Sequence, residues 1–284
     1  MKVKDVMSSP VYVIAPEEPL SRARNLMLKH GVSRLVVVDG EIPVGIITKS
    51  DLMWKLGQAE PAWRRRPIDR VPVKVIMSEH LVTTYLEASL EDVSELMLGN
   101  DISGIPVVGI DGLVGIITKS NLVHHLSTVR LDIKVEDIMS DFVVMVHRHH
   151  SISHVIAEMD RNDVHRVIVM EGGNTPVGII TSSNLAFTEL RDGKGKPPEK
   201  TIKMVRKESP AGRKKFRDVE VVHLVAEDVM SSPLITIGRD ALVTDAAKIL
   251  VAHKIDGVPV IDDEEMVGIV TKTDIIKLIS GGLR

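Results

Sequence analysis

Four copies of a Gly-Ile-Ile-Thr strand divide this chain into four similar segments. The copies begin at four glycines: Gly45, Gly115, Gly178 and Gly268, the last with Val in place of the second Ile. A methionine lies about 38 residues before each glycine: Met7, Met77, Met139 or Met230. A fixed period of this size indicates one supersecondary unit that is repeated four times.

The composition excludes several classes of protein. The chain of 284 residues contains no cysteine, so disulfides, thiolate metal sites and a cysteine nucleophile are excluded. No apolar run approaches the roughly 20 residues that cross a bilayer, and the N-terminus lacks the apolar core of a signal peptide. The net charge of −3 argues against a general affinity for nucleic acid. We therefore expect a globular, cytoplasmic protein with no membrane association.

Each repeat is expected to fold as a β-α-β-β-α unit. In the first copy, Leu20, Ala23, Leu26 and Met27 share one helical face, and Gly31 is placed to end the helix. A short apolar strand follows, and a turn rich in Asp and Gly leads into the Gly-Ile-Ile-Thr strand. A second helix is expected to begin at the Asp or Asn three residues after the Thr. One unit leaves a sheet face uncovered, so two pairs of units are expected.

The fold class is therefore α/β (α+β), with four repeats and one insert. The repeats are expected at residues 1–57, 73–128, 132–190 and 223–284. Residues 191–222 contain eleven Lys or Arg and five acidic residues. Within them, Thr201–Lys207 and Phe216–Val222 alternate as strands do, so a basic, hairpin-like insert is expected.

The best candidate for a binding site is the junction between each Gly-Ile-Ile-Thr strand and its second helix. Free N–H groups at a helix N-terminus, together with the Thr hydroxyl, suit a phosphate. The carboxylate that follows can accept hydrogen bonds from both hydroxyls of a ribose, and the glycine lets a planar ring approach the strand. The simpler alternative is that the Asp or Asn only caps the helix. The candidate residues are Gly45, Thr48, Asp51, Thr118, Asn121, Thr181, Asn184, Gly268, Thr271 and Asp274.

The whole pattern resembles the cystathionine β-synthase (CBS) domain. The resemblance rests on the Asp-Val-Met segment at Asp228, the Gly-Val-Pro-Val-Ile strand at Gly257 and the Gly-Ile-Val-Thr-Lys-Thr-Asp segment at Gly268. It covers nearly the entire chain except the basic insert. CBS domains pair into Bateman modules that bind adenine nucleotides or related adenosyl ligands. Two modules in one chain are similar to the γ subunit of AMP-activated protein kinase, in which they form a flat disc.

The resemblance also implies how the sites are shared between repeats. In that family, the partner repeat completes each site with the segment just before its second strand. It implies that Thr271 and Asp274 share the preferred site with His165 and Arg166. The other implied combinations are Ser33 and Arg34 with Thr118 and Asn121, Gly104 and Ile105 with Thr48 and Asp51, and Asp256 with Thr181 and Asn184. We expect Asp256 to repel phosphate, and we expect the two asparagine sites to grip a ribose less well.

These observations predict a non-catalytic regulatory protein that senses an adenine nucleotide or adenosyl ligand, as in energy sensing, and relays its occupancy to a partner. AMP, ADP, ATP and S-adenosylmethionine remain alternatives, with Arg34 and Arg166 favouring a phosphorylated ligand. The partner is expected to be another protein or a second copy of the chain. The alternative function is nucleic-acid binding through the insert at 191–222, with the CBS sites as its ligand-controlled regulator. No catalytic residue and no metal site are expected, although His147, His149 and His150 form a cluster.

Overall fold

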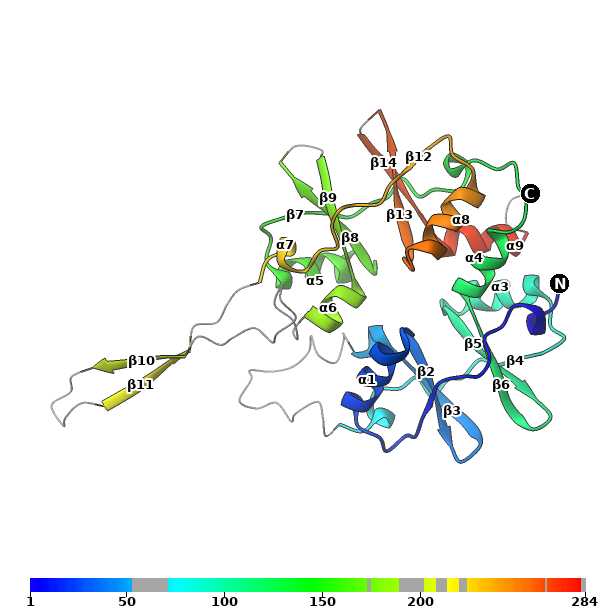
Figure 1. Cartoon of the computed structure of the whole chain (residues 1–284), viewed down its shortest axis with the longest axis horizontal. Helices are drawn as coiled ribbons and strands as arrows, with labels where there is room; N and C mark the ends of the chain where they lie inside the picture. The colour runs from blue at the N-terminus through cyan, green and yellow to red at the C-terminus, as the bar shows by residue number, and fades with distance from the viewer. Residues whose placement is uncertain are drawn as a thin grey trace. The chain divides into compact units, whose positions relative to one another are not determined.

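The computed structural model of the chain divides into two compact units (Figure 1). It describes residues 1–52, 71–172, 175–188, 202–207, 214–219, 224–263 and 265–281. Unit 1 comprises Met1–Val143 and Ile235–Arg284, and unit 2 comprises Val144–Leu234. Unit 1 therefore holds the first and second repeats and the body of the fourth, whereas unit 2 holds the body of the third. Within these ranges, no helix is both long enough and apolar enough to span a membrane.

The predicted β-α-β-β-α order is present in unit 1. The first repeat has a 3-10 turn η1 (Val3–Asp5), β1 (Val13–Ile14), α1 (Leu20–His30), β2 (Arg34–Asp39), β3 (Ile42–Thr48) and helical residues at 49–52. The second has η3 (Val73–Val75), β4 (Thr84–Tyr85), α3 (Leu90–Gly99), β5 (Gly104–Gly109), β6 (Gly112–Thr118) and α4 (Lys119–Leu126). The fourth has α7 (Ala226–Val229), β12 (Ile237–Gly238), α8 (Val243–Ala252), β13 (Gly257–Asp262), β14 (Glu265–Thr271) and α9 (Lys272–Ile279), of which α7 lies in unit 2.

The third repeat follows the same order and carries the insert. It has η4 (Val135–Asp137), β7 (Met145–His147), α5 (Ile152–Arg161), β8 (Arg166–Glu171), β9 (Thr175–Thr181) and α6 (Ser182–Thr188), of which η4 lies in unit 1. The insert contributes β10 (Ile202–Lys207) and β11 (Lys214–Val219), which pair antiparallel. The hairpin-like insert is therefore confirmed, with its second strand two residues earlier at the start than predicted. The other residues of 191–222 lie outside the described ranges.

The helix boundaries follow from local chemistry. Helix α1 ends at Gly31, whose φ of 64° is the left-handed conformation that glycine adopts without strain. Helix α3 begins after Ser89, whose side chain accepts a hydrogen bond from the backbone N–H of Asp92. The apolar face of α3 then presents buried side chains three and four residues apart, as Leu90, Val93 and Met97 do.

Each repeat builds a three-stranded sheet in which the middle strand pairs parallel with the first and antiparallel with the last. A register shift occurs at the same place in the antiparallel hairpin of each repeat, for example between Val37 and Val38. The threonine that ends the last strand lies opposite the first residue of the middle strand. These cross-strand pairs are Arg34 and Thr48, Gly104 and Thr118, Arg166 and Thr181, and Gly257 and Thr271.

The repeats are joined in pairs by an exchange of their leading segments, which we define as residues 3–8, 73–78, 135–140 and 226–231. Each segment forms a backbone bridge to the last strand of its partner repeat. The bridges join Ser8 to Ile116, Ser78 to Ile46, Ser140 to Ile269 and Ser231 to Ile179. The first repeat thus pairs with the second, and the third with the fourth, as two Bateman modules require.

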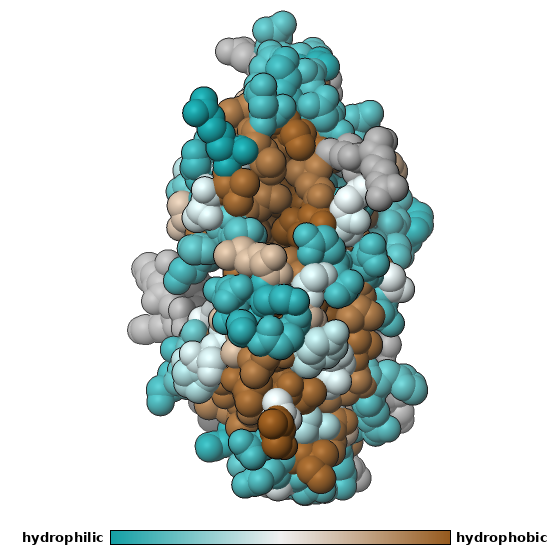
Figure 2. Space-filling view, turned by 90° about the vertical axis from the view of Figure 1, so that its right-hand side faces the viewer, coloured by the Kyte–Doolittle hydropathy of each residue, from teal (hydrophilic) through white to brown (hydrophobic). Residues whose placement is uncertain are grey.

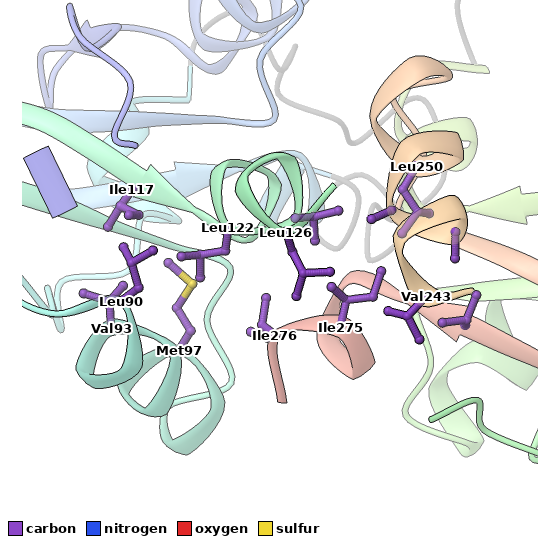
Figure 3. Close-up of a cluster of buried hydrophobic side chains, with 14 of the residues drawn as sticks. Leu90, Val93, Met97, Ile117, Leu122, Leu126, Val243, Leu250, Ile275 and Ile276 are labelled. Atoms are coloured by element: carbon purple, nitrogen blue, oxygen red, sulfur yellow. The ribbon is translucent and has the colours of Figure 1, made fainter. Parts of the chain in front are cut away.

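A second set of contacts, within unit 1, packs the second repeat against the fourth. Helix α4 contacts α8 and α9, and α3 contacts α9. Figure 3 shows side chains of these helices in one cluster, with Leu122 and Leu126 of α4 near Ile275 and Ile276 of α9. All four are buried, so these repeats share a hydrophobic core. The first repeat builds a separate core around α1 and β2.

The surface retains some apolar character. The face in Figure 2 carries hydrophobic side chains in an upper and a lower area, with hydrophilic residues between them. The exposed large apolar side chains of unit 1 include Tyr85, Ile110 and Phe142. Isolated side chains of this kind are common on folded domains and do not by themselves mark a functional site.

Candidate functional site

The repeated polar residues form a capping box at the start of each second helix. In the second repeat, Thr118 Oγ1 accepts from the N–H of Asn121 at 3.3 Å, while Asn121 Oδ1 accepts from the N–H and the hydroxyl of Thr118 at 3.0 and 2.6 Å. The threonine is therefore the N-cap, and α4 begins at Lys119. The prediction that the helix begins at the Asp or Asn is wrong by two residues, because the reciprocal bonds place that residue at the third helical position.

The two aspartate copies hold a carboxylate in this box, half-buried at Asp51 and buried at Asp274. Asp51 Oδ2 accepts from the N–H and hydroxyl of Thr48 at 2.7 and 2.8 Å. Asp274 Oδ2 accepts from the same groups of Thr271 at 3.0 and 2.6 Å, and its other oxygen accepts from Lys277 at 3.1 Å. Burial raises the pKa of the Asp51 carboxyl, although the bonds from Thr48 oppose the shift. The carboxylate is thus held in place at an electrostatic cost.

The two asparagine copies use their extra donor for a different contact. Asn121 Nδ2 donates to Ser8 Oγ at 3.0 Å, and Asn184 Nδ2 donates to Ser231 Oγ at 3.0 Å. Both serines belong to the leading segment of the partner repeat. A carboxylate has no donor for this contact, so the four junctions fall into two chemical classes. Our sequence reasoning missed both serines, although Met-Ser-Ser-Pro occurs only at residues 7–10 and 230–233.

The glycine of each junction has a packing partner. A Cβ atom at Gly45 would lie 2.8 Å from the backbone oxygen of Ser78, and one at Gly268 would lie 2.8 Å from that of Ser140. Met77 and Met139 press on the same two glycines. The glycines therefore allow the partner's leading segment to approach the strand closely. Any ligand ring has to share this surface with a methionine.

Arg34 reaches both junctions of the first pair of repeats. It lies opposite Thr48 in its own hairpin, and its guanidinium lies against Gly104, which is opposite Thr118. Burial lowers the pKa of the Arg34 guanidinium to about 10, and the charge of Asp256 opposes this shift. The structure places Arg34 against Gly104, the cross-strand neighbour of Thr118. The shared site of Arg34 with Thr118 and Asn121 stays a prediction. Ser33 is exposed, and Ile105 is fully buried next to Gly104.

The residues of the preferred site belong to two units. Thr271 and Asp274 lie in unit 1, and His165 and Arg166 lie in unit 2. Arg166 begins β8 opposite Thr181, and the carbonyl of His165 accepts from the N–H of Ser182 at 3.1 Å. Because each half is described within its own unit, their combination in one site stays a prediction.

Asp256 is not an isolated negative charge. Its carboxylate lies 2.7 Å from Lys272 Nζ, and its charge also acts on Arg34 and Lys49. The prediction that Asp256 repels phosphate treated the carboxylate alone. In the structure, three cations of unit 1 interact with this carboxylate, and its effect on a phosphate stays a prediction.

The histidine cluster lies in unit 2 at the start of α5. The rings of His147 and His149 are 5.1 Å apart, and those of His150 and His154 are 4.3 Å apart. Over the residues that the structure describes, no group of three or more His, Cys, Asp or Glu residues is arranged to hold a metal ion.

Comparison with known proteins agrees with this geometry. The sequence profile of the CBS domain matches residues 3–57, 65–128, 135–188 and 225–281. The chain is 29% identical over 288 residues to the uncharacterized protein MJ1404 of Methanocaldococcus jannaschii, covering 98% of this chain and 62% of that relative. It is 31% identical over 121 residues to the CBS domain-containing protein YhcV of Bacillus subtilis, covering 42% of this chain and 81% of that protein.

Solved structures share the fold over the whole chain. The crystal structure of MJ1225 from Methanocaldococcus jannaschii, described as a candidate archaeal homologue of γ-AMPK, aligns with a TM-score of 0.80 at 22% identity. The alignment covers 98% of this chain and 100% of MJ1225. An uncharacterized conserved protein from Pyrococcus horikoshii aligns with a TM-score of 0.65 at 16% identity, covering 98% of this chain and all of that one. With four matched repeats that exchange their leading segments in pairs, this chain belongs to the CBS domain family, whose paired domains are generally regulatory rather than catalytic.

Proposed function

We propose that this protein is a non-catalytic sensor that binds an adenine nucleotide or adenosyl ligand at the aspartate junctions. Asp51 and Asp274 accept the two ribose hydroxyls, and the threonine before each contributes a hydroxyl and the helix N-terminus beside it. Arg34 supplies charge for a phosphate in the first pair of repeats. Arg166, together with His165, supplies it in the second pair.

The main support for this proposal is that the capping box forms without a carboxylate in two of the four repeats. Asn121 and Asn184 make the same bonds to Thr118 and Thr181 that the aspartates make to their threonines. Asparagine performs this role without the desolvation that raises the pKa of Asp51. A buried charge retained where a neutral residue suffices is typical of a binding site.

The ligand class follows from what a carboxylate in this position can do. The threonine uses two of the roughly four lone-pair sites of each carboxylate, which leaves Oδ1 of Asp51 for a diol. At Asp274, Oδ1 also accepts from the half-exposed Lys277, which a diol has to displace. The cation that reaches the first pair favours ligands with a phosphate. AMP, ADP and ATP therefore precede S-adenosylmethionine as candidates.

The test is isothermal titration of AMP, ADP, ATP and S-adenosylmethionine into the wild type and into Asp51→Asn and Asp274→Asn. Asparagine is the right replacement because it preserves the capping box. We expect micromolar binding of at least one ligand and at least a tenfold loss in one variant, which is about 1.4 kcal/mol of binding free energy. The 2′-deoxy form of that ligand should bind the wild type as weakly as the natural form binds the variant.

Two results would contradict the proposal. One is the absence of binding by all four ligands to a folded wild type. The other is equal affinity for the ribose and 2′-deoxyribose forms, which would leave the aspartates as caps alone. Relay to a partner is the second part of the proposal, and it requires the ligand to bind two conformations unequally. Hydrogen exchange of the leading segments with and without ligand measures that difference.

A further inference from the structure

The described part of unit 1 contains a cationic cluster contributed by three repeats. It consists of Arg34, Lys49 and Lys272, which interact with the carboxylate of Asp256, and of Lys119, which bonds the residue after Lys272. Lys49, Lys119 and Lys272 are the residues directly after the capping threonines of the first, second and fourth repeats. Lys119 is buried, and the side chain of Lys272 is 11% exposed.

Reciprocal hydrogen bonds fix the two lysines at the contact between the second and fourth repeats. Lys119 Nζ donates to Thr273 Oγ1 at 2.9 Å, and Lys272 Nζ donates to Ser120 Oγ at 2.8 Å. Lys272 also donates to Asp256 Oδ1 at 2.7 Å. Burial lowers the pKa values of Arg34 and Lys49, whereas the Asp256 charge raises both. The cluster is therefore cationic and partly desolvated, and Asp256 is an anion that compensates it.

Asp256 occupies a position where the other repeats have no acidic residue. The corresponding residues, whose carbonyl oxygens accept from the first N–H of the second helix, are Ser33, Ser103, His165 and Asp256. The side chain of Asp256 is 60% exposed, so an anion arriving from solvent can reach the same cations. Two anions that share one set of cations compete for it.

We propose that Asp256 is a built-in counter-anion that sets how much negative charge a ligand of the first pair of repeats can carry. Without ligand, its carboxylate neutralises part of the cluster. A phosphoryl group near Arg34 is repelled by this carboxylate, and the repulsion increases with each added phosphate. The inference rests on the proposed ligand class, and it specifies that Asp256 favours ligands of low charge.

The test compares the wild type with the variant Asp256→Ser. Serine occurs naturally at the corresponding position in two other repeats. The probes are adenosine, AMP, ATP and inorganic tripolyphosphate, each titrated at one fixed ionic strength. We expect the variant to bind ATP and tripolyphosphate about fivefold more tightly, AMP about twofold more tightly and adenosine equally, because the carboxylate is largely exposed and screened. The double variant Arg34→Gln, Asp256→Ser should lose most of the gain.

A matched control removes one carboxylate elsewhere in unit 1, in the first repeat. Glu41 is exposed in the turn at the far end of the β2–β3 hairpin from Arg34 and Thr48. Glu41→Gln makes the same change in net charge and should leave all four affinities unchanged. Asp256→Asn serves as a second replacement if the serine variant does not fold.

The outcomes separate this inference from the proposed function. If no adenosine-containing probe binds but Asp256→Ser still gains affinity for tripolyphosphate, the counter-anion stands and the proposed function fails. If AMP and ATP bind with the same ratio of affinities in wild type and variant, the counter-anion is refuted and the proposed function stands. Failure of tripolyphosphate and ATP to bind either protein also refutes it.

Discussion

Asn121 Nδ2 donates a hydrogen bond to Ser8 Oγ across the boundary between the second repeat and the first, at 3.0 Å. The same contact recurs between Asn184 and Ser231, so one member of each pair of repeats is fastened in this way. The other member presents an aspartate, which has no amide donor. In each pair of repeats, one junction therefore has its amide bonded to the partner's leading segment. The other has a carboxylate that can still accept hydrogen bonds.

Ser8→Ala tests the fastening role. It leaves the amide of Asn121 without its protein acceptor, and we expect a loss of about 0.5–1.5 kcal/mol in the free energy of unfolding. The matched change is Ser78→Ala, which faces the aspartate junction of the first repeat and should cost less than about 0.5 kcal/mol. Urea denaturation of both variants measures the difference. Equal effects would show that the serine hydroxyl stabilises its own segment rather than the asparagine.

Asp51→Asn tests the electrostatic cost of the carboxylate. Because burial raises the pKa of Asp51 in the folded state, ionisation of this group destabilises the fold. The cost is absent at low pH, appears as pH rises through the range above the ordinary aspartate pKa, and is complete at neutral pH. We expect the variant to be more stable than the wild type at pH 7 by up to about 1 kcal/mol. The difference should disappear near pH 3, and a variant less stable at pH 7 would contradict this reading.

Gly45→Ala tests the exchange of leading segments. The added Cβ would lie 2.8 Å from the backbone oxygen of Ser78, which cannot move without breaking the bridge between Ser78 and Ile46. We expect a loss of about 1–3 kcal/mol in stability. Gly99→Ala, in α3, meets nothing within 4 Å and has no positive φ. It should be neutral or stabilising, by up to about 1 kcal/mol. Thermal unfolding of the two variants distinguishes a packing requirement from a general effect of glycine.

His150→Asn tests the histidine cluster. Burial lowers the pKa of His150, the neighbouring rings of His154 and His147 lower it further, and Glu158 opposes them. Arg148, which is paired with Glu227 and Glu171, lies in the same loop. Because the pKa is depressed in the folded state, stability is complete above the ordinary histidine pKa of about 6.5 and is lost as pH falls below it.

Asparagine can replace the Nδ1 acceptor that His150 offers to the N–H of His147. The variant should therefore lose less stability than the wild type between pH 7.5 and 5.5, in a series of melting curves. His253→Asn, an exposed histidine outside the cluster, is the control and should melt like the wild type across this range. If the melting temperatures of His150→Asn and the wild type fell equally between pH 7.5 and 5.5, His150 would not be a source of the loss of stability at low pH.

The repeat unit could be predicted from the sequence because each element has its own local signal. The apolar run of β2, the face of α1 and the stop at Gly31 depend on residues within a few positions of one another. The start of the second helix could not be placed as well, since both Thr118 and Asn121 are good capping residues. The reciprocal bonds that decide between them appear only in three dimensions.

For the candidate site, too, the sequence predicts local features but not contacts between distant residues. The junction residues could be found because they repeat with the strand. The contact of Arg34 with Gly104 was not implied by the family resemblance, which placed Arg34 with Thr118 and Asn121, and it appears only in the structure. The link between Asp256 and Arg34 joins the first repeat to the fourth. No sequence pattern records an electrostatic interaction between residues so far apart, so the sequence could not show that Asp256 also acts on Arg34.

The exchange of leading segments also has a consequence for how the chain is made. Ser8 leaves the ribosome on the order of 100 residues before Ile116, the residue with which it pairs, and synthesis at roughly 5–20 residues per second makes that interval many seconds long. Until then, Met7 has no Gly115 to pack on. The first repeat therefore lacks these contacts until the second has been synthesised. The exchange of leading segments within this pair cannot be completed before the second repeat has emerged.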